Sequence, residues 1–127
     1  MKPNNIIVVK SKNFAINCIK LYQFLNNKKY EYVISKQLLR SGTSIGANVK
    51  EAIRGQSTAD FKAKMNIALK EASETEYWIE ILNESNYLTK SETADLLNDC
   101  RELIKILTSI VKTTNERINS QFTMHNS

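Results

Sequence analysis

Residues 38–52 constrain the fold most, because they keep the apolar spacing of a helix while placing glycine and hydroxyl residues inside it. The stripe recurs at steps of three and four, through Ile34, Leu38, Ser41, Ile45, Asn48 or Val49, and Ala52. Gly42 and Gly46 each cost about 1 kcal/mol relative to Ala in a helix interior, and Ser and Asn are poor helix formers. We therefore expect a helix that approaches a neighbour closely or buries polar groups with partners. The pattern indicates a helical bundle, not a reaction.

The composition favours a single all-α domain. The chain has 127 residues with only three Gly and one Pro, which leaves little turn chemistry for a β fold. The longest aliphatic run, residues 6–9, is far shorter than the ~20 residues of a membrane span. A basic-then-apolar leader with a cleavage site is not recognisable. We expect a cytoplasmic protein with no membrane association.

Apolar periodicity predicts four helices, and short connections between them favour an antiparallel up-down four-helix bundle over residues 12–119. The expected helices run from about 12 to 26, 31 to 54, 57 to 86 and 89 to 118. Ser57 with Asp60, and Thr89 with Glu92, have the spacing of helix-capping pairs. Gly55 is expected to end the second helix.

The two ends of the chain are expected to differ from the bundle. Residues 6–9 are β-branched, so residues 1–11 are predicted to form a short extended N-terminal arm that packs on the bundle or on another subunit. Residues 120–127 are polar and are predicted to be a disordered tail, which contains His125, the only histidine.

Cysteine and histidine usage gives little support for a metal or cofactor. Cys18 and Cys100 both lie on apolar stripes, where they form either a redox pair or, as a reducing cytosol favours, two small buried hydrophobes. A set of zinc ligands is lacking, and a carboxylate di-iron centre needs an inward Glu-x-x-His motif that this chain does not have. We expect no metal, no cofactor and no catalytic residues.

Charge is distributed unevenly along the chain. Residues 1–55 carry ten Lys and Arg against two Glu, whereas residues 56–127 carry eight Lys and Arg against eleven Asp and Glu. Four cations share one face of the second predicted helix: Lys36, Arg40, Lys50 and Arg54. This face is a candidate RNA- or DNA-binding surface. Alternatively, it is solvated or pairs with acids such as Glu76, Glu80 and Glu84 of an adjacent subunit.

A second apolar patch lies on the third predicted helix, away from its main stripe. Ile67, Trp78 and Ile81 form this patch, which we assign to an oligomer interface because Trp is enriched as an anchor there. The alternative is one wide core stripe with Trp78 at its edge.

Ser41, Ser44 and Asn48 are the polar residues on the stripe of the second predicted helix. We expect buried polar packing, with hydrogen bonds to a neighbouring helix, because an unpartnered buried polar group costs about 1–3 kcal/mol. The alternative is a small-ligand carrier or an enzyme that uses this cluster.

Residues 37–49, followed by Glu51, Asp60-Phe61, residues 67–72 and Glu76, carry a resemblance to a known family. This pattern, with its Arg-Ser-x-x-Ser-Ile-x-x-Asn core, resembles the 23S rRNA intervening-sequence protein family of bacteria, whose match extends from about Asn4 to Ile118. That family is similar to the accessory variability protein of diversity-generating retroelements, a basic bundle that works with a reverse transcriptase and nucleic acid. The resemblance implies a four-helix bundle assembled as a homopentamer, with no known catalytic activity. We therefore expect a non-enzymatic oligomeric scaffold or adaptor of unknown process, with non-specific affinity for RNA or DNA.

Overall fold

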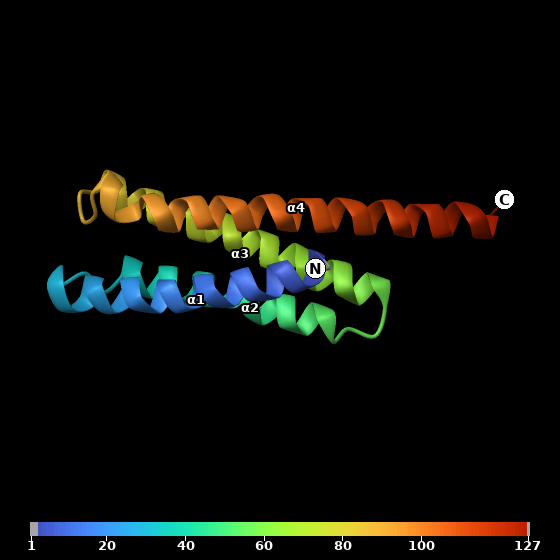
Figure 1. Cartoon of the computed structure of the whole chain (residues 1–127), viewed down its shortest axis with the longest axis horizontal. Coiled ribbons are helices and arrows are strands. Elements are labelled where there is room, and N and C mark those ends of the chain that lie inside the picture. The colour runs from blue at the N-terminus through green and yellow to red at the C-terminus, as the bar shows by residue number, and fades with distance from the viewer. Residues whose placement is uncertain (1–2, 127) are drawn as a thin grey trace.

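The computed structural model describes the backbone of residues 3–126 and the side chains of residues 6–124. It contains four helices: α1 (Pro3–Lys28), α2 (Ile34–Ile53), α3 (Thr58–Glu84) and α4 (Lys90–Asn126). Successive helices run in opposite directions and are joined by short connections at alternating ends (Figure 1). The all-α, antiparallel up-down arrangement predicted from periodicity is confirmed for the described residues.

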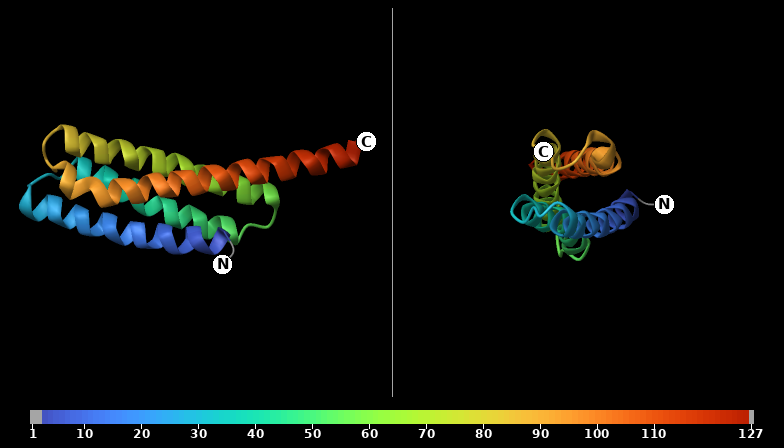
Figure 2. Two further views of the ribbon diagram at one scale, coloured as in Figure 1. Left: turned by 45° about the horizontal axis from the view of Figure 1, so that its top comes forward. Right: turned by 90° about the vertical axis from the view of Figure 1, so that its left-hand side faces the viewer.

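The helices surround one core in the order α1, α2, α3, α4 (Figure 2). Each helix packs against its neighbours in that order, and the closing pair, α1 with α4, makes the least extensive contact. The core takes its largest buried side chains from all four helices, including Phe14, Leu38, Ile79 and Leu107. The spacing of these apolar residues turns one stripe of each helix inward.

Local capping signals explain three of the helix starts and stops. The Ser57 hydroxyl accepts a 3.0 Å hydrogen bond from the Asp60 amide, and Thr89 and Glu92 bond reciprocally at 2.8 and 3.1 Å. Both predicted caps are confirmed. Helix α3 ends before Asn86, which adopts a left-handed φ of 68°.

Helix α2 begins one turn later than its periodicity predicts. The buried Glu31 carboxylate accepts hydrogen bonds from the amides of Val33, Ile34 and Ser35. A side chain that satisfies these first amide groups must lie before the helix, so Glu31 acts as a cap and α2 starts at Ile34.

The extended N-terminal arm is a wrong prediction for the described residues, because α1 is already helical from Pro3. Ile7 and Ser11 fall on the same stripe as Phe14 and Cys18, and both are buried. Burial of Ile7 in the core outweighs the β preference of the Ile6–Val9 run, which is only a weak local tendency. Residues 1 and 2 lie outside the described residues.

The prediction of a disordered tail is also wrong for residues 120–126, which continue α4 as helix. Neither Gly nor Pro occurs after Gly55, and no described residue after Asn86 adopts a left-handed backbone conformation, so nothing in the described part of α4 stops the helix. Helix α4 therefore extends beyond the α2–α3 connection and away from the other helices (Figures 1 and 2). Residue 127 lies outside the described residues.

Cys18 and Cys100 are free, buried thiols in the core. Burial raises the pKa of the Cys100 thiol to about 12 and raises the pKa of Cys18 as well. Both side chains therefore stay protonated near neutral pH, which suits packing and not redox chemistry.

Candidate functional site

The four predicted cations of α2 separate into different environments. Arg40 faces α3, where its guanidinium forms ion pairs with Glu71, at 3.1 Å, and with Glu74. Its partners therefore lie on another helix of the same chain. The hydrogen bond that Arg40 donates to the Glu74 carboxylate raises the pKa of Arg40. Arg40 links α2 to α3 and is already neutralised.

Glu74 joins this ion pair to the predicted interface tryptophan. Its carboxylate accepts a 3.0 Å hydrogen bond from the Trp78 indole. This bond, followed by those from Arg40, holds the pKa of Glu74 below its usual value. The indole is half-buried and packs against the core, which leaves part of the ring exposed.

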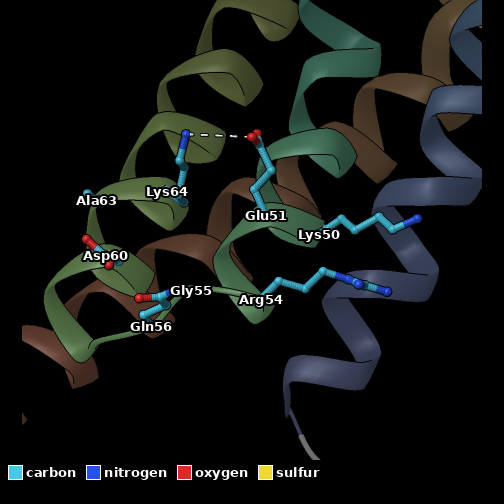
Figure 3. Close-up of a pocket in the computed structure, with 8 residues that line it drawn as sticks. All are labelled: Lys50, Glu51, Arg54, Gly55, Gln56, Asp60, Ala63 and Lys64. Carbon is cyan, nitrogen blue, oxygen red and sulfur yellow. Dashed lines mark ion pairs between the residues drawn. The ribbon is translucent and has the colours of Figure 1, made fainter.

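Lys50 lies in the last turn of α2, Arg54 follows the helix directly, and both turn towards α1 (Figure 3). Both contribute to a wide depression at the α2–α3 connection, where Lys64 pairs with Glu51 at 3.8 Å (Figure 3). Their charged ends point out of this depression, towards α1 (Figure 3). The depression is therefore not the place where these two cations act.

Lys50 and Arg54 also line a groove between α1 and α2. This α1–α2 groove has a volume of about 490 Å³ and is lined by Val8, Ser11, Lys12, Ala15, Thr43, Gly46, Ala47, Lys50, Ile53 and Arg54. Its lining includes small and aliphatic residues, and at Gly46 the two helices are so close that an added Cβ would lie 3.3 Å from the Ser11 carbonyl oxygen of α1. Three exposed cations border it, and the sequence prediction missed Lys12 because that residue lies on another helix.

The sign of charge distinguishes this groove from the other cavities described. The depression at the α2–α3 connection includes Glu51 and Asp60, and two grooves between α1 and α4 include Asp99 with other acids. The lining of the α1–α2 groove contains three cations and no carboxylate. An anionic ligand would meet no repulsion there.

Lys36 does not belong to this site. It is exposed in the first turn of α2, fourteen residues before Lys50, which corresponds to about 21 Å along a helix axis. The predicted basic face is therefore divided: Lys36 at one end, a neutralised Arg40, and Lys50 with Arg54 at the other end.

Of the predicted polar cluster, only Ser41 bonds to another helix. Its buried hydroxyl accepts a 2.8 Å hydrogen bond from Thr75 of α3. Ser44 donates to the Arg40 carbonyl and Asn48 donates to the Ser44 carbonyl, each at 2.8 Å and within α2. Ser44 and Asn48 are half-buried, so they need no partner from a neighbouring helix.

The apolar patch of α3 is partly covered by its own bundle. Ile67 is 41% exposed, whereas Trp78 and Ile81 are half-buried. A second apolar surface, which sequence reasoning missed, lies on the outside of α1, where Val9 is 51% exposed and Ile16 is 44% exposed. The seven-residue spacing of this pair could have revealed it once α1 was recognised as helical from Pro3.

The acidic line of α3 is partly used within the chain, because Glu76 pairs with Arg101 of α4 at 2.9 Å. No group of three His, Cys, Asp or Glu side chains within the described part of the chain is arranged to hold a metal ion. None of the helices in residues 3–126 combines the length and the hydrophobicity that crossing a bilayer requires.

Comparisons with known proteins agree with this bundle. A crystal structure from Bacteroides thetaiotaomicron VPI-5482, described as a protein with unknown function from the S23 ribosomal protein family, is 51% identical to this chain. The match covers 87% of this chain and 99% of that one, with a TM-score of 0.86. No curated protein sequence matches. The model of the 23S rRNA-intervening sequence protein family matches residues 3–109. Because the family model matches most of the length of this chain, the chain belongs to the 23S rRNA-intervening sequence protein family.

Proposed function

We propose that this protein is a non-enzymatic, cytoplasmic scaffold that assembles into a homo-oligomer, a ring of five, and binds RNA or DNA through a basic face. The observation that carries the proposal is the pair of apolar surfaces that one bundle leaves open, on the outside of α1 and along α3. Val9 and Ile16 on α1 and Ile67 on α3 each retain about half of their surface in water. Exposed apolar patches of this kind mark association surfaces.

Two different apolar surfaces favour head-to-tail assembly. The α1 patch (Val9 and Ile16) and the α3 patch (Ile67, Trp78 and Ile81) lie on different helices, and neither is a copy of the other. An interface between unlike surfaces repeats from subunit to subunit and closes into a ring when the rotation allows it. This geometry supports the ring of five that the family resemblance implies.

Light scattering coupled to size exclusion tests the assembly. Because one chain is 14.5 kDa, a pentamer has a mass of about 72 kDa. Ile16→Glu and Ile67→Glu are each expected to give monomers, since either change buries an unpaired charge in the interface. Circular dichroism of each variant confirms that the exposed substitution leaves the helices folded.

Mixing the two variants separates head-to-tail from two-fold pairing. In a head-to-tail interface, Ile16→Glu and Ile67→Glu together retain one intact pair of surfaces, so the mixture should form heterodimers of about 29 kDa, twice 14.5 kDa. A mixture that stays monomeric contradicts the two-surface interface. A wild-type protein that is monomeric at micromolar concentration contradicts the oligomer itself.

The nucleic-acid part of the proposal is supported by Lys12, Lys50 and Arg54, which form no ion pair among the described side chains. Arg40 does not contribute, because Glu71 and Glu74 neutralise it. Titration of labelled RNA and DNA at several salt concentrations tests this part, because phosphate contacts weaken as salt rises. The nucleic-acid part fails if no binding is detected at about 50 mM salt, or if binding does not weaken as the salt concentration rises.

The alternative, a small-ligand carrier or an enzyme built on Ser41, Ser44 and Asn48, has less support. All three side chains already have hydrogen-bond partners within the bundle. A catalytic role needs a nucleophile with a base beside it, and these neighbours are backbone carbonyls and another hydroxyl.

A further inference from the structure

We infer that the α1–α2 groove is a binding site for single-stranded nucleic acid, with Lys12, Lys50 and Arg54 as its phosphate contacts. This inference rests on the nucleic-acid part of the proposed function and assigns it to one place. It also replaces a stripe along α2 with a site made by two helices, in which Lys12 is a new member and Lys36 and Arg40 take no part.

Positive charge without an acidic partner is concentrated at this groove. Lys12, Lys50 and Arg54 border the groove with no acid in its lining. Some cations elsewhere in the chain are paired instead, such as Lys10 with Glu102, Lys64 with Glu51 and Arg101 with Glu76. Three like charges around one depression attract a polyanion, since each neutralised phosphate releases condensed counterions.

The groove is accessible to a phosphodiester backbone. The groove floor consists of short side chains, with Ala15 from α1 and Gly46 and Ala47 from α2. A phosphodiester backbone can therefore lie deep enough for side chains on both helices to reach it. In Figure 3 the ends of Lys50 and Arg54 extend across the space towards α1. These two residues are one turn apart, which is about 6 Å along the helix axis.

The shape of the groove suits a single strand better than a duplex. The groove lies between two packed helices, whose axes are typically about 8–10 Å apart, and is therefore too narrow for a rigid duplex to enter. A flexible single strand follows a basic groove, as proteins that bind single strands without sequence preference do. No aromatic ring lines this groove, so binding should depend on the backbone and not on the base.

Two larger aliphatic residues in the groove lining favour one competing ligand, an acidic peptide. Val8 and Ile53 are 36% and 44% exposed, and an acidic amphipathic peptide could place its apolar face on them. The groove floor is mostly small residues, however, and offers no deep pocket for a large apolar anchor. We therefore assign the groove to nucleic acid and make the acidic polypeptide an outcome of the test.

The test is fluorescence anisotropy with labelled 12-nucleotide oligo-dT and oligo-U, a 12-base-pair duplex and poly-glutamate, using the full chain. Both single strands should bind, more tightly than the duplex or poly-glutamate. Three phosphate contacts predict that log K falls with log salt at a slope of about −2, since each contact contributes about −0.7 for single strands. Each single replacement of a groove cation by Gln should reduce that slope by about 0.7.

Matched variants separate the groove from diffuse attraction. Lys50→Glu and Lys36→Glu change the net charge equally on the same helix, and only Lys50 lines the groove. Lys50→Glu should weaken binding about tenfold or more, and Lys36→Glu by less than about twofold. Ala47→Leu leaves the charge unchanged and fills the floor, and it should also weaken binding severalfold. Circular dichroism checks that each variant is folded.

Several outcomes would overturn the inference, and they separate it from the proposed function. Equal losses for Lys36→Glu and Lys50→Glu, with Ala47→Leu neutral, would refute the groove and leave non-specific binding standing. Tighter binding of the duplex or of poly-glutamate would refute the single-stranded ligand. If no nucleic acid binds, the groove and the nucleic-acid part of the proposed function both fail. The monomeric Ile67→Glu variant should still bind, because the groove lies within one subunit and Ile67 does not line it, and loss of binding there would contradict that placement.

Discussion

The two edges of α2 use the same residue types for opposite purposes. On the edge that faces α3, Arg40 is paired with two carboxylates and Ser41 accepts a buried hydrogen bond from Thr75. On the edge that faces α1, Lys50 and Arg54 border a groove without acids, and glycines provide the packing. Whether a cation on a helix stabilises the fold or is free to bind a ligand thus depends on which residues surround it. The predictions below test this difference.

The largest effect is expected where α2 packs most closely on α1. A Cβ at Gly42 would clash with Cys18 Sγ and lie 3.1 Å from Cys18 Cβ. Gly42→Val should therefore destabilise the protein by about 3 kcal/mol, the upper end of overpacking costs. Ala47→Val adds a branched side chain at an exposed position of the same helix and is the control. Urea denaturation measures both, and equal stability of the two variants would contradict close packing at Gly42.

A smaller loss is expected at the polar contact between α2 and α3. Thr75→Val keeps the shape of the side chain but leaves the buried Ser41 hydroxyl without its donor. The expected cost is about 1–2 kcal/mol, within the range for an unsatisfied buried group. Adding Ser41→Ala should recover part of that loss, because both partners are then apolar. Strict additivity of the two changes in urea denaturation would show that the hydroxyls do not interact.

Removal of the ion pair on this edge should matter less. The Arg40 side chain is 51% exposed, so solvent screens its attraction to Glu71 and Glu74. Arg40→Gln should cost about 0.2–1 kcal/mol, as is usual for exposed ion pairs. The loss should shrink in 1 M NaCl, where the screening length is about 3 Å. A loss that is unchanged by salt would mean that Arg40 acts through packing.

The same pair predicts a pH dependence. The folded-state pKa of Glu74 lies below its ordinary value of 4.5, mainly through the Trp78 hydrogen bond. Its contribution to stability is present above the unfolded pKa and is lost as the pH falls through the folded value. Trp78→Phe should therefore lose less stability between about pH 6 and pH 3 than the wild type does. Tyr77→Phe, next to it and without a bond to Glu74, should keep the wild-type pH dependence.

The smallest effect is expected on the edge that faces α1. Lys12 has no ion-pair partner among the side chains of residues 6–124 and borders the groove only. Lys12→Gln should change the free energy of unfolding by no more than about 0.5 kcal/mol, as exposed substitutions usually do. A clear loss of stability in urea denaturation would indicate that Lys12 holds α1 to α2. The cations on both edges of α2 would then stabilise the fold.

Sequence reasoning succeeded where the signal was local. The Ser57 and Thr89 caps depend on side chains and amides three residues apart, so their spacing predicts the bond directly. The family motif and the four-helix architecture could also be predicted from the sequence. Reasoning failed for residues 3–11, where a β-branched run is helical because Ile7 joins a core made by other helices. Propensity is weaker than burial.

The candidate site was only half predictable for the same reason. Lys50 and Arg54 share a helical face that can be read from one segment, but Lys12 belongs with them only through the packing of α1 on α2. Equally, nothing within α2 shows that Arg40 pairs with Glu71, because 31 residues separate them in sequence.

The sequence by itself determined that this chain forms helices, where two of them begin, which stripe of each turns inward and to which family it belongs. Only the tertiary structure decided which cations are neutralised and which border an open groove. The physical reason is range: caps and apolar periodicity act within a turn or two, whereas charge pairing depends on which helices lie side by side.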